Sequence, residues 1–171
     1  LRSIRQDHDR LLQRLRQVPD LQAAWLILTM CAGTRASFYL RNLPPPLTND
    51  FAQAHDQAMW DCLSSLDLPP APPPTEPWGR NVAQLPMRSG CLGLRSATRT
   101  APAAYWASWA DCFPMIAARH PAAATRFLNA LEHNIHQHNG DPIPSIDELK
   151  RCSAILRDEG MTNMPSWRGL A

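Results

Sequence analysis

The residues from Asp20 to Pro46 read DLQAAWLILTMCAGTRASFYLRNLPPP and carry most of the information about the N-terminal architecture. Around Trp25 and Leu28 this stretch is apolar on every face, which predicts a helix over about 21–42 that is buried among other helices. Asp20 can cap its first turn. The proline run after Leu43 ends it. A helix of this kind needs helical neighbours, so the sequence predicts a bundle.

Amphipathic helices are expected on both sides of this stretch. The first runs over about 4–18 before Pro19, and the second begins near Thr48 or Asn49. The apolar stripe of the first helix consists of Ile4, His8, Leu11, Leu12, Leu15 and Val18. That of the second consists of Phe51, His55, Met59, Cys62, Leu63 and Leu66. Three helices with short connections predict a compact bundle over residues 1–66.

A proline-rich segment follows this bundle. Six prolines fall between Asp67 and Pro77, and such a density favours the extended polyproline II conformation. A stiff linker is a simpler interpretation than a ligand for a proline-binding module. The sequence therefore predicts three parts: a three-helix region 1–66, a linker 67–79, and a C-terminal region 80–171.

The C-terminal region is expected to be helical after one irregular element. Residues 85–95 are rich in turn formers, and Ser89-Gly90 can make a tight turn between two extended pieces. Helices are expected from between 96 and 101 to 113, and over 121–137. A capping box at Ser145 opens a third helix that ends at Gly160 and buries Ile146, Leu149, Cys152 and Leu156. The fold class is thus mainly α, a multi-helix bundle with one short extended or hairpin element near 85–95.

Composition narrows the function classes. The five cysteines are odd in number and form no CxxC pair, so a disulfide scaffold or zinc framework is not expected. Reduced thiols favour an intracellular protein, either cytoplasmic or nuclear. The longest apolar run, about 23–33, is too short to span a bilayer, and no membrane partner is expected.

Positive charge is concentrated in one part of the chain. Residues 80–126 contain six arginines against Asp111 alone. These arginines are Arg80, Arg88, Arg95, Arg99, Arg119 and Arg126, and the aromatic residues among and beside them are Trp78, Tyr105, Trp106 and Trp109. Arginines alternating with rings are typical of nucleic-acid contact. The alternative is a solvated basic face around a packed aromatic core.

Motifs for catalysis are not found. His133, His136 and His138 follow Glu132, but their spacing differs from the His-Glu-x-x-His zinc motif and favours a polar helix end. No serine lies in a Gly-x-Ser-x-Gly elbow, and no two aspartates are adjacent. We therefore expect no catalytic residue, no metal site and no cofactor in this chain.

Two stretches together resemble a known family. The first combines residues 21–26, Arg35 and the sequence YLRNLPP at 39–45; the second is LPMRSGCLGLRSA at 85–97, followed by APAAYWAS at 101–108. Over about residues 8–115 the chain resembles the region after the catalytic core in reverse transcriptases of non-LTR (LINE-type) retrotransposons. In that family a helical thumb precedes a linker with an LP-x-x-x-GGLGL-RS signature. Cys91 replaces its second glycine, and a positive φ there would strain a cysteine.

The resemblance implies a binding role. The thumb of such an enzyme grips a template–primer duplex through its backbone, and Arg35, Arg41, Arg88 and Arg95 match basic positions of the family. Charge clustering alone adds Arg99. Polymerisation needs metal-binding aspartates of the palm, which this chain lacks, so it is expected to be a non-catalytic part of an RNA-directed DNA polymerase. The implied partners are the backbone of RNA, DNA or an RNA–DNA hybrid, and the polymerase core of the same polyprotein.

Two other interpretations remain open. One is a helical protein-interaction module, in which the Trp-rich helix over 101–113 docks a partner. It predicts a large exposed aromatic patch. The other is a degenerate retroelement remnant without a selected function, an interpretation with which the Cys91 departure is consistent.

Overall fold

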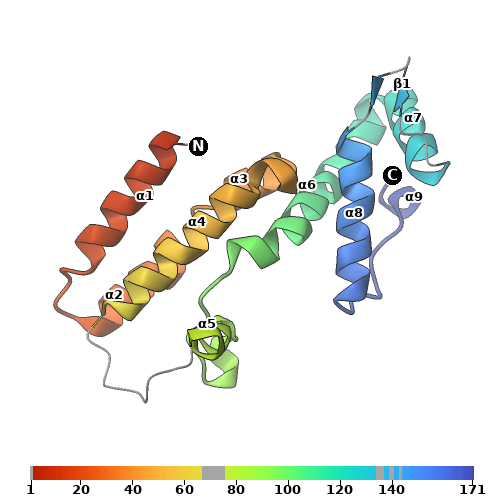
Figure 1. Cartoon of the computed structure of the whole chain (residues 1–171). Coiled ribbons are helices and arrows are strands. Elements are labelled where there is room, and N and C mark those ends of the chain that lie inside the picture. Colours follow the sequence, from red (N-terminus) through yellow and green to blue (C-terminus); the bar gives the residue numbers. More distant parts are fainter. Residues whose placement is uncertain (1, 67–75, 134–136, 139–140, 143) are drawn as a thin grey trace. The chain divides into compact units, whose positions relative to one another are not determined.

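The computed structural model describes residues 2–66, 76–133, 137–138, 141–142 and 144–171 (Figure 1). It is mainly helical, which confirms the predicted fold class. The elements are α1 (Arg2–Leu15), α2 (Leu21–Leu26), the π-helical η1 (Ile27–Ala32), α3 (Ser37–Asn42), α4 (Pro45–Ser64), α5 (Glu76–Gln84), the 3-10 turn η2 (Met87–Ser89), α6 (Ala97–Arg119), α7 (Pro121–Glu132), β1 (Gln137–His138), β2 (Asp141–Pro142), α8 (Pro144–Asp158) and α9 (Trp167–Leu170).

The chain forms two compact units. Unit 1 comprises residues 1–38 and 49–100, and unit 2 comprises residues 39–48 and 101–171. Helices α3, α4 and α6 contribute residues to both units. Residues 80–100 thus fall in the unit of the N-terminal helices, and residues 39–48 fall in the other unit. Most of the predicted linker 67–79 lies outside the described residues, so the predicted division into 1–66, 67–79 and 80–171 stays a prediction.

The core of unit 1 is built from α1, α2, η1 and α4. Asp20 caps α2 as predicted, because its Oδ1 accepts a hydrogen bond from the Ala23 amide at 2.6 Å. The predicted apolar stripes are largely confirmed. Core residues from these elements and from α5 and the loop after it are Leu12, Leu15, Ala24, Leu28, Ala32, Met59, Cys62, Leu63, Leu66, Ala83 and Leu94. Helix α4 begins at Pro45 rather than near Thr48, and proline suits the first turn because no amide is needed there.

The predicted continuous helix over 21–42 is wrong. After α2 the chain forms the π-helical turn η1, in which the Gly33 amide donates to the Leu28 carbonyl at 2.9 Å. The Thr29 hydroxyl donates to the Trp25 carbonyl at 2.9 Å and thereby competes with the regular backbone ladder. The stretch is also not buried on all faces, since Leu26, Met30 and Phe38 are 43%, 58% and 67% exposed.

The predicted hairpin element near 85–95 is a closed loop without strands; the strands described in the structure are β1 and β2, which pair antiparallel. The Gly93 amide donates to the Leu85 carbonyl at 2.9 Å, and the Leu94 amide donates to the Ala83 carbonyl at 2.9 Å. Gly90 and Gly93 adopt left-handed φ values of 76° and 66°. The predicted tight turn at Ser89-Gly90 is thus confirmed, and the two left-handed glycines lie on either side of Cys91.

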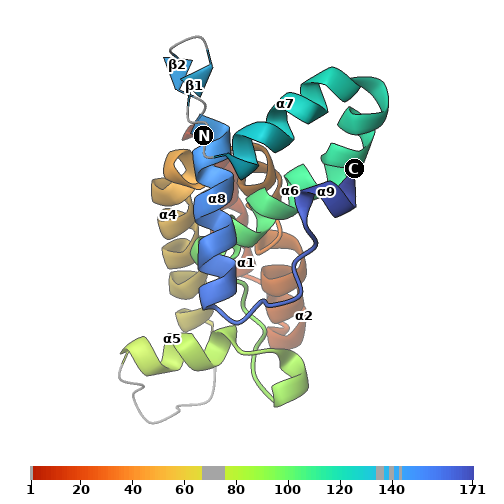
Figure 2. The same cartoon turned by 90° about the vertical axis from the view of Figure 1, so that its right-hand side faces the viewer.

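Unit 2 has an aromatic core to which α6, α7, α8 and the C-terminal tail contribute. Figure 2 shows the ribbons of these elements. The Trp109 and Phe127 rings stack with centroids 5.2 Å apart, and Trp167 contacts Trp106, Phe113 and Phe127. Helix α8 buries the predicted Ile146, Leu149, Cys152 and Leu156. Aromatic packing therefore includes α9, for which the aperiodic tail gave no signal.

Helix ends in unit 2 differ from the predicted ones. Helix α6 continues past Phe113 through Pro114 to Arg119, and α7 ends at Glu132 rather than at 137. The predicted stop after α8 is confirmed: Gly160 has a φ of 92°, and the Met161 amide donates to the Leu156 carbonyl at 2.9 Å. A left-handed glycine closes the helix in this way because it carries no Cβ.

Candidate nucleic-acid interface

Three of the five predicted arginines lie close together along the chain in unit 1. Arg88 belongs to η2, Arg95 lies just before α6, and Arg99 lies in the first turn of α6. All three side chains are exposed. Within the part of the chain that the structure describes, none of the three has an ion-pair partner. Their positive charge is therefore available to an external anion.

The loop that carries Arg88 and Arg95 is anchored from several sides. Two backbone hydrogen bonds close it onto the end of α5. The Trp25 indole N–H of α2 donates to the Leu92 carbonyl at 3.2 Å. Buried Leu94 joins the core of unit 1. These contacts hold the backbone between the two arginines, so less conformational entropy is lost when their side chains bind a ligand.

Asp56 of α4 occupies the N-terminus of α6. Its carboxylate accepts hydrogen bonds from the Ala97 amide at 2.6 Å and the Thr98 amide at 3.0 Å, and from the Ser96 hydroxyl at 2.8 Å. A helix N-terminus is otherwise a natural phosphate site. Here the Asp56 carboxylate occupies that position, so a phosphate would have to bind the exposed guanidinium groups instead of the helix N-terminus. Sequence reasoning missed Asp56 because it lies about 40 residues before α6.

Arg35 and Arg41 are placed differently from the other three. Arg35 is exposed in the turn after η1, and its Nη1 donates to the Asp7 carbonyl at 3.4 Å. Arg41 belongs to unit 2, where its guanidinium pairs with Asp111 Oδ2 at 2.6 Å and its carbonyl accepts from the Ser108 hydroxyl. The structure therefore does not group Arg41 with the other predicted residues, and its charge already has a partner.

Most of the predicted aromatic partners belong to the core. Tyr105 and Trp106 are buried in unit 2, and Trp109 stacks on Phe127. The predicted alternation of arginines with stacking rings is wrong for these three, because their rings pack against α7, α8 and the C-terminal tail. Trp78 of α5 is 65% exposed and stays available. It lies in unit 1 together with Arg88 and Arg95.

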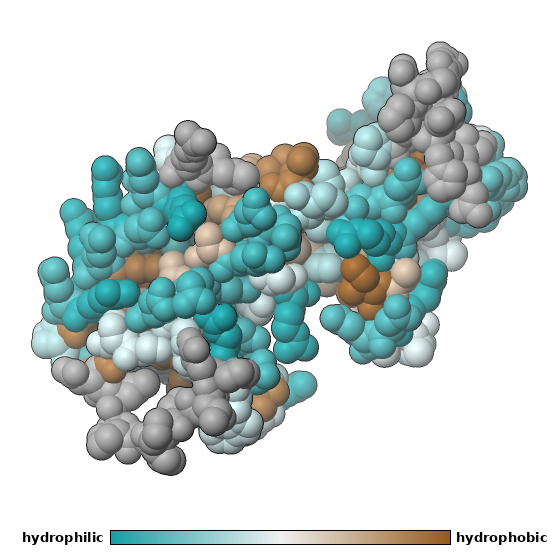
Figure 3. All heavy atoms as spheres, viewed as in Figure 1, coloured by the Kyte–Doolittle hydropathy of each residue, from teal (hydrophilic) through white to brown (hydrophobic). Residues whose placement is uncertain are grey.

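The remaining arginines of the predicted basic patch differ in their surroundings. The Arg80 guanidinium lies 5.5 Å from the Trp60 ring centroid and donates to Gln57 Oε1 at 2.7 Å, so it stabilises the fold. Arg119 and Arg126 are exposed in unit 2. The face drawn in Figure 3 is largely hydrophilic, with separate hydrophobic patches. The exposed candidate residues of unit 1 are thus Trp78, Arg35, Arg88, Arg95 and Arg99.

Titratable groups elsewhere are structural in character. His8 and His55 stack in unit 1 with ring centroids 4.5 Å apart, and burial lowers the pKa of both, to about 4 for His8. Burial raises the pKa of the Cys62 thiol and that of Cys152, the latter to about 12, which keeps both thiols protonated and unreactive. Glu132 is paired with Arg168, and His136 lies outside the described residues.

Comparisons with protein-family models, with curated proteins and with solved structures found no match to this chain. Among the helices that the structure describes, none is both long enough and apolar enough to cross a bilayer. Across the same described residues, no three histidine, cysteine or acidic side chains gather closely enough to hold a metal ion.

Proposed function

We propose that the chain binds the backbone of a nucleic-acid duplex through unit 1, as a non-catalytic, thumb-like part of a retrotransposon reverse transcriptase. The observation that carries this proposal is the set Arg88, Arg95 and Arg99: three exposed guanidinium groups without acidic partners among the described residues, on an anchored segment. The thumb-like role in a reverse transcriptase rests on the family resemblance of residues 8–115. The partner is the backbone of RNA, DNA or their hybrid, presented by the polymerase core of the same polyprotein.

The chemistry of such contacts is simple. Guanidinium groups donate forked hydrogen bonds to phosphate oxygens, and each neutralised phosphate releases counterions, so affinity falls with salt. Contacts of this kind position a duplex without reading its sequence. An exposed ring such as that of Trp78 adds a stacking surface for an unpaired base. Arg41 is left out of this interface because Asp111 neutralises it.

Fluorescence anisotropy with a labelled RNA–DNA hybrid, measured across a salt series, tests this proposal. The double variant Arg88→Glu, Arg95→Glu is expected to bind more weakly. Its slope of log K against log salt is expected to become less negative by roughly 2, because each phosphate that an arginine neutralises contributes about −0.9 to that slope. The matched control is Arg119→Glu, Arg126→Glu, which changes charge equally in unit 2. Equal affinity of the first variant and the unmodified chain would contradict the assignment.

A protein-interaction module is the second candidate. The aromatic rings of the helix over 101–113 are not available to dock a partner, because they lie in the core of unit 2. Exposure of Leu26, Met30 and Phe38 in unit 1 favours it instead. In that case Met30→Glu abolishes capture of a polymerase core in a pull-down while leaving hybrid binding unchanged. A degenerate remnant is expected to bind neither partner.

A further inference from the structure

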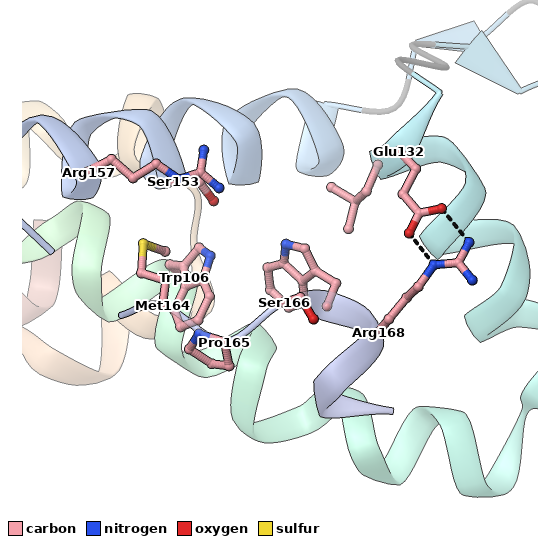
Figure 4. Close-up of a pocket in the computed structure, with 10 residues that line it drawn as sticks. Trp106, Glu132, Ser153, Arg157, Met164, Pro165, Ser166 and Arg168 are labelled. Carbon is pink, nitrogen blue, oxygen red and sulfur yellow. Dashed lines mark hydrogen bonds and ion pairs between the residues drawn. The ribbon is translucent and has the colours of Figure 1, made fainter. Parts of the chain in front are cut away.

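Unit 2 contains a pocket of about 320 Å³ between α6, α7, α8 and the C-terminal tail (Figure 4). Its walls are mostly apolar and aromatic, and they include Trp106, Leu131, Met164 and Trp167. This volume falls in the range of small-molecule sites, which typically combine apolar walls with a few polar groups. The polar groups of this pocket show what kind of ligand it suits.

Trp106 supplies a buried donor without an acceptor. The residue is 8% exposed, and its indole Nε1 has no hydrogen-bond partner among the described residues. In Figure 4 this nitrogen is directed toward the side of the pocket where Ser153 and Arg157 lie. A buried N–H group without an acceptor costs free energy. A ligand oxygen brought against this nitrogen would remove that cost, and because the nitrogen has almost no exposed surface, a neighbouring side chain must shift to admit the oxygen.

Arg157 of α8 supplies a positive charge on the same side of the pocket. Its side chain is exposed, and within the described residues it has no ion-pair partner. The other arginine of the pocket, Arg168, is already neutralised by both carboxylate oxygens of Glu132. The hydroxyl of Ser153 donates to the Leu149 carbonyl at 2.9 Å and so adds no donor toward a ligand.

These groups together describe one chemical class of ligand. One unpaired guanidinium and one neutral N–H group suit a single carboxylate, and the Glu132–Arg168 pair adds no net charge that would hold a second anionic group. Aromatic and methionine walls suit an apolar body. We propose that this pocket binds a small organic monocarboxylate, with its carboxylate between Trp106 Nε1–H and Arg157 and its ring against Trp167 and Met164. The proposal is independent of nucleic-acid binding, which involves other arginines in unit 1.

Isothermal titration calorimetry with 1-naphthylacetate on the full chain tests this proposal. A ligand of this size in a fitting pocket is expected to bind with a Kd of about 1 mM or tighter. Its neutral isostere 1-naphthylacetamide is expected to bind at least about tenfold more weakly, because it cannot form the charge-assisted hydrogen bonds. Absence of naphthylacetate binding at about 10 mM, or equal binding of the acid and the amide, would overturn the proposal.

Two variants locate the site. Arg157→Gln and Trp106→Phe are each expected to weaken naphthylacetate binding about tenfold, since one removes the charge and the other removes the N–H group together with part of the ring system. Arg126→Gln, an exposed arginine of the same unit, is the matched control and is expected to bind like the unmodified chain. Because Arg157 is exposed, its replacement leaves the core intact even if Trp106→Phe fails to fold. Unchanged binding by Arg157→Gln would contradict the site.

Discussion

At the scale of single residues, the paired histidines of unit 1 illustrate how a polar side chain serves as core. His8 of α1 and His55 of α4 each lie on an apolar stripe, and both rings are 4% exposed. Neither His8 nitrogen, nor Nε2 of His55, has a hydrogen-bond partner among the described residues. Burial is the main cause of their lowered pKa values; His55 and Arg35 lower that of His8 further, whereas Asp56 opposes the shift at His55. Both therefore pack as neutral aromatic rings at pH 7.

The pair makes the free energy of unfolding depend on pH. His8 has a pKa of about 4 in the folded chain and 6.5 when unfolded. Below pH 6.5 the unfolded chain therefore binds protons first. Stability is fully present above pH 6.5 and is lost as pH falls toward 4, by roughly 3 kcal/mol for His8. His8→Phe keeps a ring but removes the titration, so its urea midpoint is expected to fall less between pH 7.5 and 5.

The control for this experiment is His120→Gln, because His120 is exposed. Its urea midpoint is expected to follow that of the unmodified chain at both pH values. Parallel losses of stability in the unmodified chain and in His8→Phe would show that His8 does not cause the pH dependence.

Asp56 is the second residue whose role depends on a distant segment. Asp56→Ala removes the carboxylate that caps the N-terminus of α6 through three hydrogen bonds. We expect this substitution to lower the free energy of unfolding by about 2 kcal/mol. Asp50→Ala changes an exposed aspartate of the same helix and is expected to stay within about 0.5 kcal/mol. Urea denaturation measures both; equal effects would remove the special role of Asp56.

At the scale of elements, the loop between α5 and α6 and the η1 turn depart from regular structure for local reasons. In η1 the Thr29 hydroxyl donates a hydrogen bond to the Trp25 carbonyl in the preceding turn. In the loop, two glycines adopt conformations that side chains rarely allow. Such positions are set by short-range sterics and hydrogen bonds. The loop also carries Arg88 and Arg95, so its geometry positions the candidate interface.

The two loop glycines provide a matched comparison. A Cβ at Gly93 would lie 2.9 Å from Met87 Cγ, whereas nothing lies within 4 Å of a Cβ at Gly90. A left-handed φ costs both alanine variants about 1 kcal/mol, and Gly93→Ala adds the displacement of Met87. We expect Gly93→Ala to lower the thermal unfolding midpoint more than Gly90→Ala. The reverse order would mean that the Met87 contact is unimportant.

At the scale of the whole molecule, each unit has its own core. Leu28 is fully buried in unit 1, and Leu149 is fully buried in unit 2. Replacing either side chain by alanine leaves a cavity and costs about 2–5 kcal/mol. Because local stability follows local packing, the loss of stability is expected mainly in the unit that holds the cavity.

Native-state hydrogen exchange measures this expectation. In Leu149→Ala, protection factors of amides in α7 and α8 are expected to fall, while those of α1 and α2 stay unchanged. Leu28→Ala, the reciprocal control, is expected to show the opposite pattern. A uniform loss of protection along the chain in either variant would mean that α3, α4 and α6, which contribute to both units, couple the two cores into one cooperative structure.

Helices, their buried faces and several ends followed from the sequence alone. The Asp20 cap, the stripes of α1, α4 and α8, the turn at Gly90 and the stop at Gly160 all depend on residues close together in the chain, so spacing and side-chain type were sufficient. Pairings across the chain were not predictable in this way. Tertiary structure decided that Asp56 caps α6 and that Asp111 pairs with Arg41. It also decided that Trp106 is buried and Met30 is exposed. Each of these features depends on which distant segment covers a given face. The family resemblance selected Arg88 and Arg95, and charge clustering added Arg99. Only the tertiary structure distinguished these exposed arginines from Arg41 and Arg80, whose guanidinium groups already have partners.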